Sequence, residues 1–260
     1  MPFTKNGPTR IYWEESGTGE PLLLIMGLGY AHQMWYRTRP VLERKFRTVV
    51  FDNRGVGQSD VPEGPYSIAE MADDAAAVMD AAGIRSARVF GISMGGMIAQ
   101  EFALRHANRV VRLVLGCTSF GGKTAKVAAK EVLDILRGRA NMTPEEGAEA
   151  MVPYIYDAGT PRERIDEDLV VRRSVYPTAE GYVAQVKAIN AWSCVDRLAE
   201  IKVPTLVIHG ETDQLIPAEN AYLLVERIAG AKLVMLPKAS HIFTTDQPEK
   251  AHAAILQFLE

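Results

Sequence analysis

The sequence predicts an α/β protein built on a parallel β-sheet with helices on both faces. Short apolar runs, rich in β-branched residues, each end at a glycine or a polar residue, and helical patterns separate most of them. A run that is apolar at every position fits a strand buried on both faces, which is the usual environment in a parallel sheet. Alternation of such strands with helices places helices on both sides of the sheet.

Six apolar runs are the predicted strands. The carboxyl ends of parallel strands meet at one edge of the sheet, so the loops after these runs are where site residues are expected. In chain order the runs are residues 21–26, 48–51, 87–92, 110–115, 205–208 and 232–236.

Three segments are predicted to be helices of the same core. Residues 68–82 carry apolar side chains at intervals of three and four, which form one stripe along a helix. Ser67 and Glu70 predict a capping box at its start, and Gly83 predicts its end. Further helices are expected at residues 94–106 and 249–259.

A stretch without strand patterns interrupts the alternation between about residues 120 and 196. Because it follows the strand that ends beside the loop of Ser93, we expect a helical cap over a site there, with a plain helical subdomain as the alternative. The chain then divides into a core of residues 1–119 and 196–260 and a cap of residues 120–195. Helical patterns lie at about residues 125–137, 144–156, 164–175 and 181–192.

Composition excludes several classes of protein. The chain has 260 residues, is 47% hydrophobic and carries a formal net charge of −3, which fits a globular protein and not a disordered one. We see no transmembrane run, no signal peptide and no basic stripe, so we expect neither a membrane nor a nucleic acid as partner. Two cysteines cannot form a disulfide framework or a zinc cage, and we expect a cytoplasmic protein without a metal.

Ser93 is the predicted nucleophile. It lies in a Gly-x-Ser-x-Gly pattern at residues 91–95, between a predicted strand and a predicted helix. The position between a strand and a helix makes the pattern informative. A sharp turn there exposes the serine hydroxyl, and the N-terminus of the following helix favours a developing negative charge. A capping serine in a tight turn is the alternative.

His241 is the predicted base, since a serine hydroxyl needs a neighbouring base to become a nucleophile. It lies in the loop after the last predicted strand, at the edge where site residues are expected. The other histidines fit other roles: His32 could line a pocket, His209 reads as buried and hydrogen-bonded, and His106 and His252 fall in helices.

Asp213 is predicted to orient His241, because it lies in the loop after the strand at 205–208. The resulting chain order Ser, Asp, His is one of three unrelated orders found for such triads. Glu211 and Asp246 are the alternatives. We expect Glu211 to cap its own turn and Asp246 to cap the last helix.

Two backbone N–H groups are predicted to bind the oxyanion of acyl transfer. One belongs to Met94, directly after the nucleophile. The other belongs to Leu28, in the loop 27–29, where two glycines allow a ligand to approach the backbone. This loop lacks the third glycine of a dinucleotide fingerprint and no P-loop Lys-Ser/Thr follows it, so a nucleotide cofactor is not expected.

Together these motifs resemble the α/β-hydrolase superfamily along nearly the whole chain. The resemblance rests on residues 27–29, 52–60, 91–96, 210–213 and 240–241. The segments Arg-Gly-x-Gly-x-Ser at 54–59 and Ser-Met-Gly-Gly at 93–96 are most similar to small carboxylesterases, 3-oxoadipate enol-lactonase-like proteins and cofactor-free haloperoxidase-like serine hydrolases.

The resemblance implies an eight-stranded, mostly parallel sheet, a helical cap after strand six, and a Ser-His-Asp triad without a cofactor. One position departs from the pattern, since many members have His-Gly where this chain has Met26-Gly27, which affects the packing of the oxyanion loop but not the triad. We therefore expect hydrolysis of an ester or lactone of a small substrate through an acyl-enzyme. A lactonase specialist for enol-lactones or acyl-homoserine lactones, a perhydrolase, a C–C bond hydrolase and a non-catalytic ligand sensor are the alternatives.

Apolar and aromatic side chains near the predicted site are candidates for substrate contacts, and they favour a mainly apolar substrate. We see no cluster of arginines placed to clamp a carboxylate or phosphate, although Arg54, Arg172 and Arg173 are left open. The main candidates are Trp35, Tyr154, Trp192 and Ile242, with Met97, Phe120, Tyr156 and Ile216 beside them.

Overall fold

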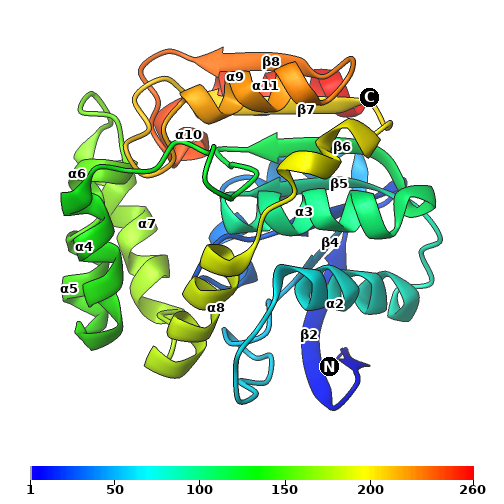
Figure 1. The fold of residues 1–260 in the computed structure, drawn as a ribbon, viewed down its shortest axis with the longest axis horizontal. Coiled ribbons are helices and arrows are strands. Elements are labelled where there is room, and N and C mark those ends of the chain that lie inside the picture. Colours follow the sequence, from blue (N-terminus) through cyan, green and yellow to red (C-terminus); the bar gives the residue numbers. More distant parts are fainter. Residues whose placement is uncertain (1) are drawn as a thin grey trace.

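The computed structural model describes residues 2–260 and contains one eight-stranded sheet (Figure 1). Its strand order is β1-β2-β4-β3-β5-β6-β7-β8. β2 pairs antiparallel with both β1 and β4, and all other pairs are parallel, which confirms the mostly parallel sheet. The bounds are β1 Phe3–Asn6, β2 Thr9–Ser16, β3 Glu20–Ile25, β4 Phe46–Phe51, β5 Ala87–Ile92, β6 Val110–Gly116, β7 Thr205–Gly210 and β8 Lys232–Leu236.

The six strands expected from apolar runs all form, and their ends differ from expectation by at most two residues. β1 and β2 were not among them. Their sequences, FTKN and TRIYWEES, mix polar and apolar residues, and both strands are only partly buried. Such mixing is typical of antiparallel strands at the side of a sheet, where one face meets water.

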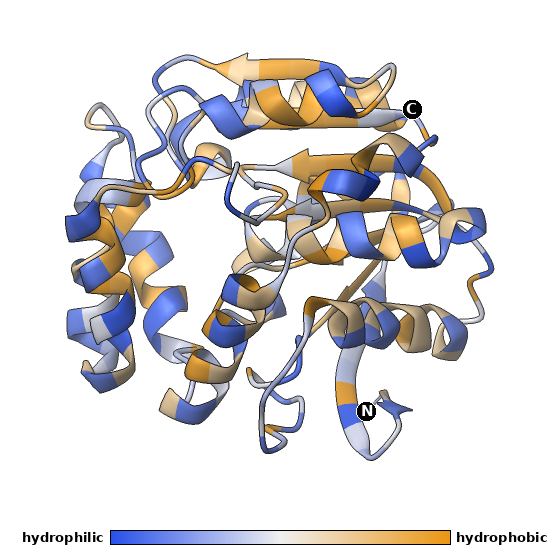
Figure 2. Cartoon of the chain, viewed as in Figure 1, coloured by the Kyte–Doolittle hydropathy of each residue, from blue (hydrophilic) through white to orange (hydrophobic). Residues whose placement is uncertain are grey.

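Neighbouring side chains of the central strands enter two different cores, because successive residues of a strand point to opposite faces. The helices concerned are α1 Arg39–Leu42, α2 Ile68–Ala81, α3 Met94–Arg105, α9 Glu219–Arg227 and α11 Pro248–Leu259. Leu23 and Ile25 pack with α2, α3 and α9, whereas Leu22 and Leu24 pack with α1 and α11. These four side chains are at most 1% exposed, and burying each contributes about 1.5–3 kcal/mol. Figure 2 shows the matching hydrophobic colouring of the central strands.

The three core helices predicted from periodicity form within one residue of their expected bounds. At the start of α2, the backbone N–H of Glu70 donates to Ser67 Oγ, as predicted. The reciprocal half of the capping box does not form. The carboxylate of Glu70 instead accepts from the Ser67 hydroxyl at 2.8 Å and from Arg54 at 3.2 Å.

A helical insertion lies between β6 and β7 and stands to one side of the sheet (Figure 1). It contains a small core of its own, which includes Val132, Met151 and Leu169. The expected helix at 144–156 forms as two, because Pro153 has no N–H with which to continue the first. The elements are α4 Lys130–Gly138, a 3₁₀ turn Arg139–Asn141, α5 Pro144–Glu149, α6 Val152–Ile155, α7 Arg162–Ser174 and α8 Ala179–Ala191.

Candidate active site

Ser93 occupies a strained turn between β5 and α3. Its backbone angles are φ 56° and ψ −125°, and its side chain makes no capping hydrogen bond. A non-glycine residue in such a conformation costs about 1–3 kcal/mol, and the surrounding contacts must hold it there. The Ser93 N–H donates to Gly116 O at 2.9 Å, and Thr118 Oγ1 donates to Ser93 O at 2.7 Å. The turn is therefore fixed from the end of β6, and the capping alternative does not apply.

The two glycines of the pattern are required by close backbone packing. A Cβ atom on Gly91 would lie 2.1 Å from Gly95 O, and one on Gly95 would lie 2.1 Å from Ile25 O. Both distances are far below van der Waals contact, so no larger residue fits at either position. The first turn of α3 thus sits directly against the ends of β5 and β3.

The loop predicted to supply an oxyanion donor lies against Ser93. A Cβ atom on Gly27 would lie 3.0 Å from Ser93 Cβ and 3.5 Å from Ser93 Oγ. Leu28 and Met94 both line the same cavity as Ser93. Among residues 2–260, neither of their backbone N–H groups donates to another backbone group. Both donors are therefore free for a ligand in the part of the chain that is described.

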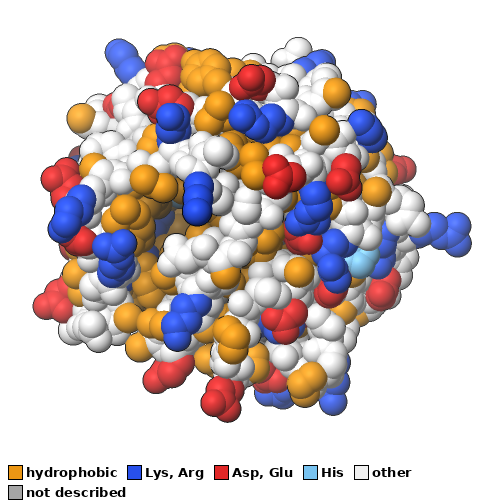
Figure 3. All heavy atoms as spheres, viewed as in Figure 1, with side chains coloured by type: hydrophobic (Ala, Val, Ile, Leu, Met, Phe, Trp, Pro, Cys, Tyr) orange, Lys and Arg blue, Asp and Glu red, His pale blue; other side chains and the backbone are white. Residues whose placement is uncertain are grey.

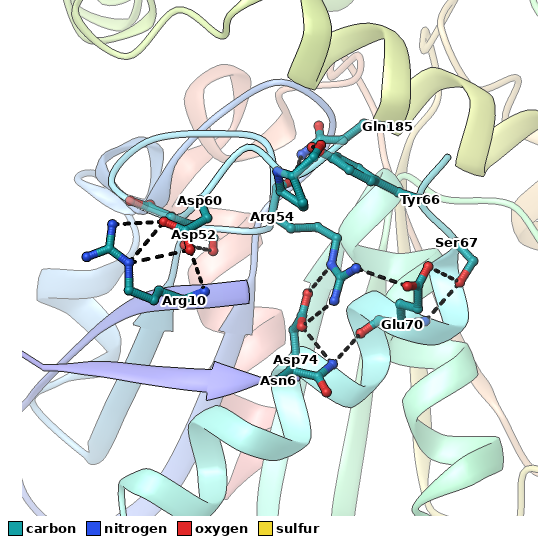
Figure 4. Close-up of polar contacts among 12 residues, drawn as sticks. Asn6, Arg10, Asp52, Arg54, Asp60, Tyr66, Ser67, Glu70, Asp74 and Gln185 are labelled. Atoms are coloured by element: carbon teal, nitrogen blue, oxygen red, sulfur yellow. Dashed lines mark hydrogen bonds and ion pairs between the residues drawn. The ribbon is translucent and has the colours of Figure 1, made fainter. Parts of the chain in front are cut away.

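The segment 52–60, singled out by its motif, supports this loop from behind. Asn53 Nδ2 donates to Met26 O at 2.9 Å. From the insertion, Gln185 accepts from the Gly29 N–H at 2.8 Å and donates to Arg54 O at 2.8 Å. Figure 4 shows Gln185 beside the backbone of Arg54, whose side chain reaches away toward Asp74. These bonds fix the loop 27–29 between the sheet and α8.

His241 and Asp213 meet at the carboxyl edge of the sheet. His241 follows β8 and Asp213 follows β7, and His241 Nδ1 lies 2.8 Å from Asp213 Oδ2. The other oxygen of Asp213 accepts from the backbone N–H groups of Leu215 and Ile216, both at 2.9 Å. Asp213 is thus held rigidly while it orients the imidazole ring. His241 and Ser93 line the same cavity.

The charge of Asp213 is stabilised although its side chain is fully buried. Burial alone would raise the pKa of this carboxyl, but the charge of His241 and hydrogen bonds from His209 and His241 lower the pKa to about 2. The carboxylate is therefore ionised at neutral pH. His209 is buried and hydrogen-bonded, as predicted, with Nε2 2.8 Å from Ile216 O and 3.1 Å from Asp213 Oδ2.

The two alternative carboxylates lie elsewhere. Glu211 is exposed. Asp246, in the short helix α10 (Phe243–Asp246), does not cap the last helix as predicted, since the residue before that helix makes no side-chain cap. Its carboxyl accepts from Ser240 N and from Thr160 Oγ1, both at 2.6 Å, because the chain folds back over the loop of His241. Burial raises the pKa of Asp246 to about 6.

Ser93 and His241 open into a cavity of about 470 Å³ whose wall is mostly apolar. Figure 3 shows hydrophobic side chains around a hollow on this face, with Lys and Arg side chains beside it. Of the predicted contacts, Ile242, Met97 and Ile216 line this cavity. Four further methionines share the wall, and the sequence did not single them out as substrate contacts: Met26, Met34, Met94 and Met151.

The aromatic candidates are wrong as substrate contacts, because Trp35, Phe120, Tyr154, Tyr156 and Trp192 do not line the cavity. Trp35 packs on Phe90 with ring centroids 5.1 Å apart. Trp192 donates to Glu101 at 2.9 Å. The others pack in the hydrophobic cores. These five aromatic side chains pack in the core and the insertion, whereas Tyr30 and Tyr36 line the cavity.

His32 was a further pocket candidate and is also placed elsewhere. Its Nδ1 lies 2.7 Å from Asp52 and its Nε2 lies 3.2 Å from Glu14, so both ring nitrogens are engaged. His32 is absent from the cavity wall. The remaining histidines pair with side chains outside the cavity, His106 with Asp73 and His252 with Thr38.

The two cysteines are free, buried thiols. Cys117 lines the cavity, but burial raises the pKa of its thiol well above the ordinary value, which disfavours a reactive thiolate. Within residues 2–260, no group of three or more His, Cys, Asp or Glu is placed to hold a metal ion. In the same residues, no helix has both the length and the hydropathy to cross a membrane.

Comparison with known proteins places the chain among hydrolases. Among curated relatives, the Azorhizobium caulinodans protein RutD, named as a candidate carbamate hydrolase, is 30% identical over 263 residues, covering 99% of this chain and 98% of its own. The solved enol-lactonase from Burkholderia xenovorans is 29% identical with a TM-score of 0.87, covering 99% of each chain. A thermophilic esterase from Thermogutta terrifontis is 29% identical with a TM-score of 0.83, covering 98% of this chain and 96% of its own.

The family match agrees with the fold and with the motifs at the sheet edge. A family model described as the alpha/beta hydrolase fold matches residues 20–248. This span runs from β3 through the insertion to the start of α11, and so includes Ser93, Asp213 and His241. The chain therefore belongs to the α/β-hydrolase family.

Proposed function

We propose that this protein is a serine hydrolase that cleaves carboxylic ester or lactone bonds through an acyl-enzyme. The observation that carries the proposal is the arrangement of Ser93 and His241 on one cavity wall, with His241 held at 2.8 Å by the ionised Asp213. A strained, partly buried serine at a cavity, beside an oriented imidazole, is the combination that nucleophilic acyl transfer requires. The esterase and the enol-lactonase among the similar structures support the same chemistry.

The first half of the reaction forms the acyl-enzyme. The ionised carboxylate of Asp213 only accepts hydrogen bonds, so His241 Nδ1 carries the proton and Nε2 is free to act as the base. Ser93 Oγ attacks the carbonyl carbon while Nε2 takes its proton. The N–H groups of Leu28 and Met94 then bind the oxyanion of the tetrahedral intermediate. When this intermediate collapses, Nε2 gives its proton to the leaving alkoxide.

The second half releases the acid. Nε2 takes a proton from a water molecule, the hydroxide attacks the acyl carbonyl, and Ser93 Oγ leaves with the proton returned from His241. In a lactone the alkoxide belongs to the same molecule as the acyl group, so the product is one hydroxy acid. For an enol-lactone the released enol becomes a ketone.

We also propose that residues 120–195 act as a cap that excludes bulk water from the cavity. Part of the cavity wall comes from this segment, including Leu133, Leu136 and Met151. Part of the wall is thus supplied by the insertion, which would set the shape of the substrate. We propose a cytoplasmic location, because both cysteines within residues 2–260 are free thiols and form no disulfide.

A direct assay compares p-nitrophenyl butyrate with γ-lactones of similar size, measuring nitrophenolate release and acid release. We expect turnover of at least one class, and fast lactone opening with poor ester turnover would identify a lactonase. A simple alkyl carbamate is included, because the RutD relative makes it the second candidate. Binding of these compounds without turnover would identify a ligand sensor and reject the proposal.

A further inference from the structure

Two arginines of the insertion are buried at the cavity wall. Arg139, in the 3₁₀ turn after α4, and Arg172, in α7, are each only 4% exposed, and both line the cavity that holds Ser93. Burying a guanidinium is costly unless a counter-charge or hydrogen bonds replace water. The groups that contact these two side chains therefore show whether the protein itself compensates their charges.

The protein partners of the two guanidinium groups are neutral. Arg139 Nη2 donates to Tyr30 OH at 2.9 Å, and Arg172 Nε donates to Tyr156 OH at 3.2 Å. Both guanidinium groups also lie over the ring of Tyr30, at 5.4 and 4.6 Å from its centroid. Asp168, one helical turn before Arg172, pairs with Arg37 at 3.3 Å and accepts from Tyr156 OH at 2.9 Å, so it reaches Arg172 through that hydroxyl and not through a salt bridge. Within residues 2–260, neither arginine forms a salt bridge.

Arg54 shows how the same chain neutralises a buried arginine. It is 5% exposed, and its guanidinium donates to both oxygens of Asp74 at 2.7 and 2.8 Å and to Glu70 at 3.2 Å. Figure 4 shows this fork and the carboxylates that receive it. Arg173, next to Arg172 on α7, likewise pairs with Glu149 at 3.6 Å. Arg139 and Arg172 differ from both because, within residues 2–260, they line the cavity without forming a salt bridge.

The cavity wall carries more basic than acidic side chains although the chain carries a net charge of −3. Its only acidic residue among those described is Asp168, which is already paired with Arg37. The charges of the two arginines also act on the hydroxyl of Tyr30. Burial alone would raise the pKa of the Tyr30 hydroxyl, but the charges of Arg172 and Arg139 outweigh it and hold the pKa below its ordinary value. The basic residues of the wall are Arg37, Lys123, Lys126, Arg137, Arg139 and Arg172.

We propose that Arg139 and Arg172 form a carboxylate-binding subsite, so that the substrate is an ester or lactone carrying an ionised carboxylate. The planar guanidinium forks suit a carboxylate, and burial strengthens such charge-assisted hydrogen bonds. Apolar side chains such as Met34 and Met151 share the cavity wall and fit an apolar spacer between the acid and the scissile carbonyl. The proposal rests on the hydrolase function above and adds an acid group to the mainly apolar substrate expected from the sequence.

The first test measures binding without catalysis. Ser93→Ala protein is titrated by calorimetry with hexanoate and with its neutral isostere hexanamide. We expect hexanoate to bind at least about 10-fold more tightly, since hydrogen bonds to a charged group contribute about 1.5–3 kcal/mol. Adding Arg139→Gln or Arg172→Gln should remove this preference, whereas Arg173→Gln on the same helix should keep it. Equal binding of the two ligands to the Ser93→Ala protein would overturn the subsite.

The second test measures turnover of matched esters. For the wild type, mono-p-nitrophenyl adipate should have a KM at least about 10-fold below that of p-nitrophenyl hexanoate. Arg139→Gln and Arg172→Gln should raise the KM for the adipate ester about 10- to 100-fold and leave the hexanoate KM within about twofold. Equal effects on both esters would assign the arginines a purely structural role and contradict the subsite.

The two tests separate failure of the subsite from failure of the hydrolase function. Arginine-dependent hexanoate binding without turnover of any ester would reject the hydrolase function and keep the subsite. Turnover that depends on Ser93 but shows no preference for the acid would reject the subsite alone. If a glutamine variant does not fold, as seen in its thermal melt, Arg139→Lys and Arg172→Lys take its place. These keep the charge but lose the planar fork, so a smaller rise in the adipate KM is expected and no rise would contradict the proposal.

Discussion

Replacing Ser93 by alanine is expected to lower kcat/KM for ester or lactone hydrolysis by about 10³- to 10⁶-fold. The variant keeps the free N–H groups of Leu28 and Met94 and the cavity, so only residual catalysis by binding and charge stabilisation remains. The fold should be little affected, because Gly91 and Gly95 still form the turn and Ser93 Oγ makes no capping bond. Steady-state kinetics with a thermal melt on the same sample measure both effects.

Ser119→Ala is the matched control for this experiment. Ser119 lines the same cavity and follows β6, but it lies outside the turn between β5 and α3. We expect its kcat/KM to stay within a few-fold of the wild type. A Ser93→Ala variant that folds normally and retains wild-type turnover would show that another group is the nucleophile.

Replacing Asp213 by asparagine is expected to lower kcat by about 10⁴-fold, the size of the effect when the orienting aspartate of a serine hydrolase is changed in this way. An asparagine amide can donate to His241 Nδ1, which stabilises the tautomer that carries its proton on Nε2. That tautomer cannot accept the proton of Ser93. Measurement of kcat for Asp213→Asn beside Glu211→Gln, the exposed alternative carboxylate, checks this assignment, and an equal loss in both variants would refute it.

The same substitution should change the acid stability of the protein. Asp213 has a pKa of about 2 in the fold against an ordinary 3.8, so the folded state binds this proton more weakly than the unfolded chain. Its ionised form therefore stabilises the fold above pH 3.8, and this contribution disappears as the pH falls toward 2. Asparagine does not titrate, so urea unfolding of Asp213→Asn should show a smaller loss of stability between pH 5 and 2 than the wild type.

The placement of Ser93, Asp213 and His241 at one edge of the sheet could be predicted because their signals are local. The glycines around Ser93 are required because a Cβ atom at either position would clash with a neighbouring carbonyl oxygen, and this requirement leaves the same pattern in any sequence that makes the turn. Asp213 and His241 follow directly after two parallel strands, and the carboxyl ends of such strands meet by geometry alone. The strands themselves were recognisable because they are apolar on both faces.

The substrate pocket could not be predicted, because it depends on how the insertion packs on the core. Tyr154 and Trp192 are residue types common in pockets, but Trp192 is buried in the main core and Tyr154 packs, partly buried, against the core of the insertion. Arg139 was not noticed, since nothing near it in the sequence separates a buried arginine at a cavity from an exposed one. What distinguishes Arg139 is that it has no carboxylate partner within the described residues. Contact partners come from distant segments, as Tyr30 does for Arg172, so the local sequence does not reveal them.

The antiparallel strand β2, which lies between β1 and β4, was missed for a related reason. Its register with β4, which pairs Trp13 with Phe51, is set by long-range pairing and not by an apolar run. Its polar positions face solvent or neighbouring side chains, as in the bond between Tyr12 and Glu14. A half-buried antiparallel strand of eight residues gives a weaker pattern than a buried parallel one.

The most direct measurement is covalent labelling by a p-nitrophenyl phosphonate, followed by mass spectrometry of the tryptic peptide 89–105. Ser93 Oγ should attack phosphorus and displace p-nitrophenolate, which leaves the phosphonyl group on this peptide with one equivalent bound per chain. The label should vanish in Ser93→Ala and fall by orders of magnitude in His241→Ala, which lacks the base. Absence of the label from the wild-type peptide, or its unchanged appearance in His241→Ala, would contradict an activated serine at this site.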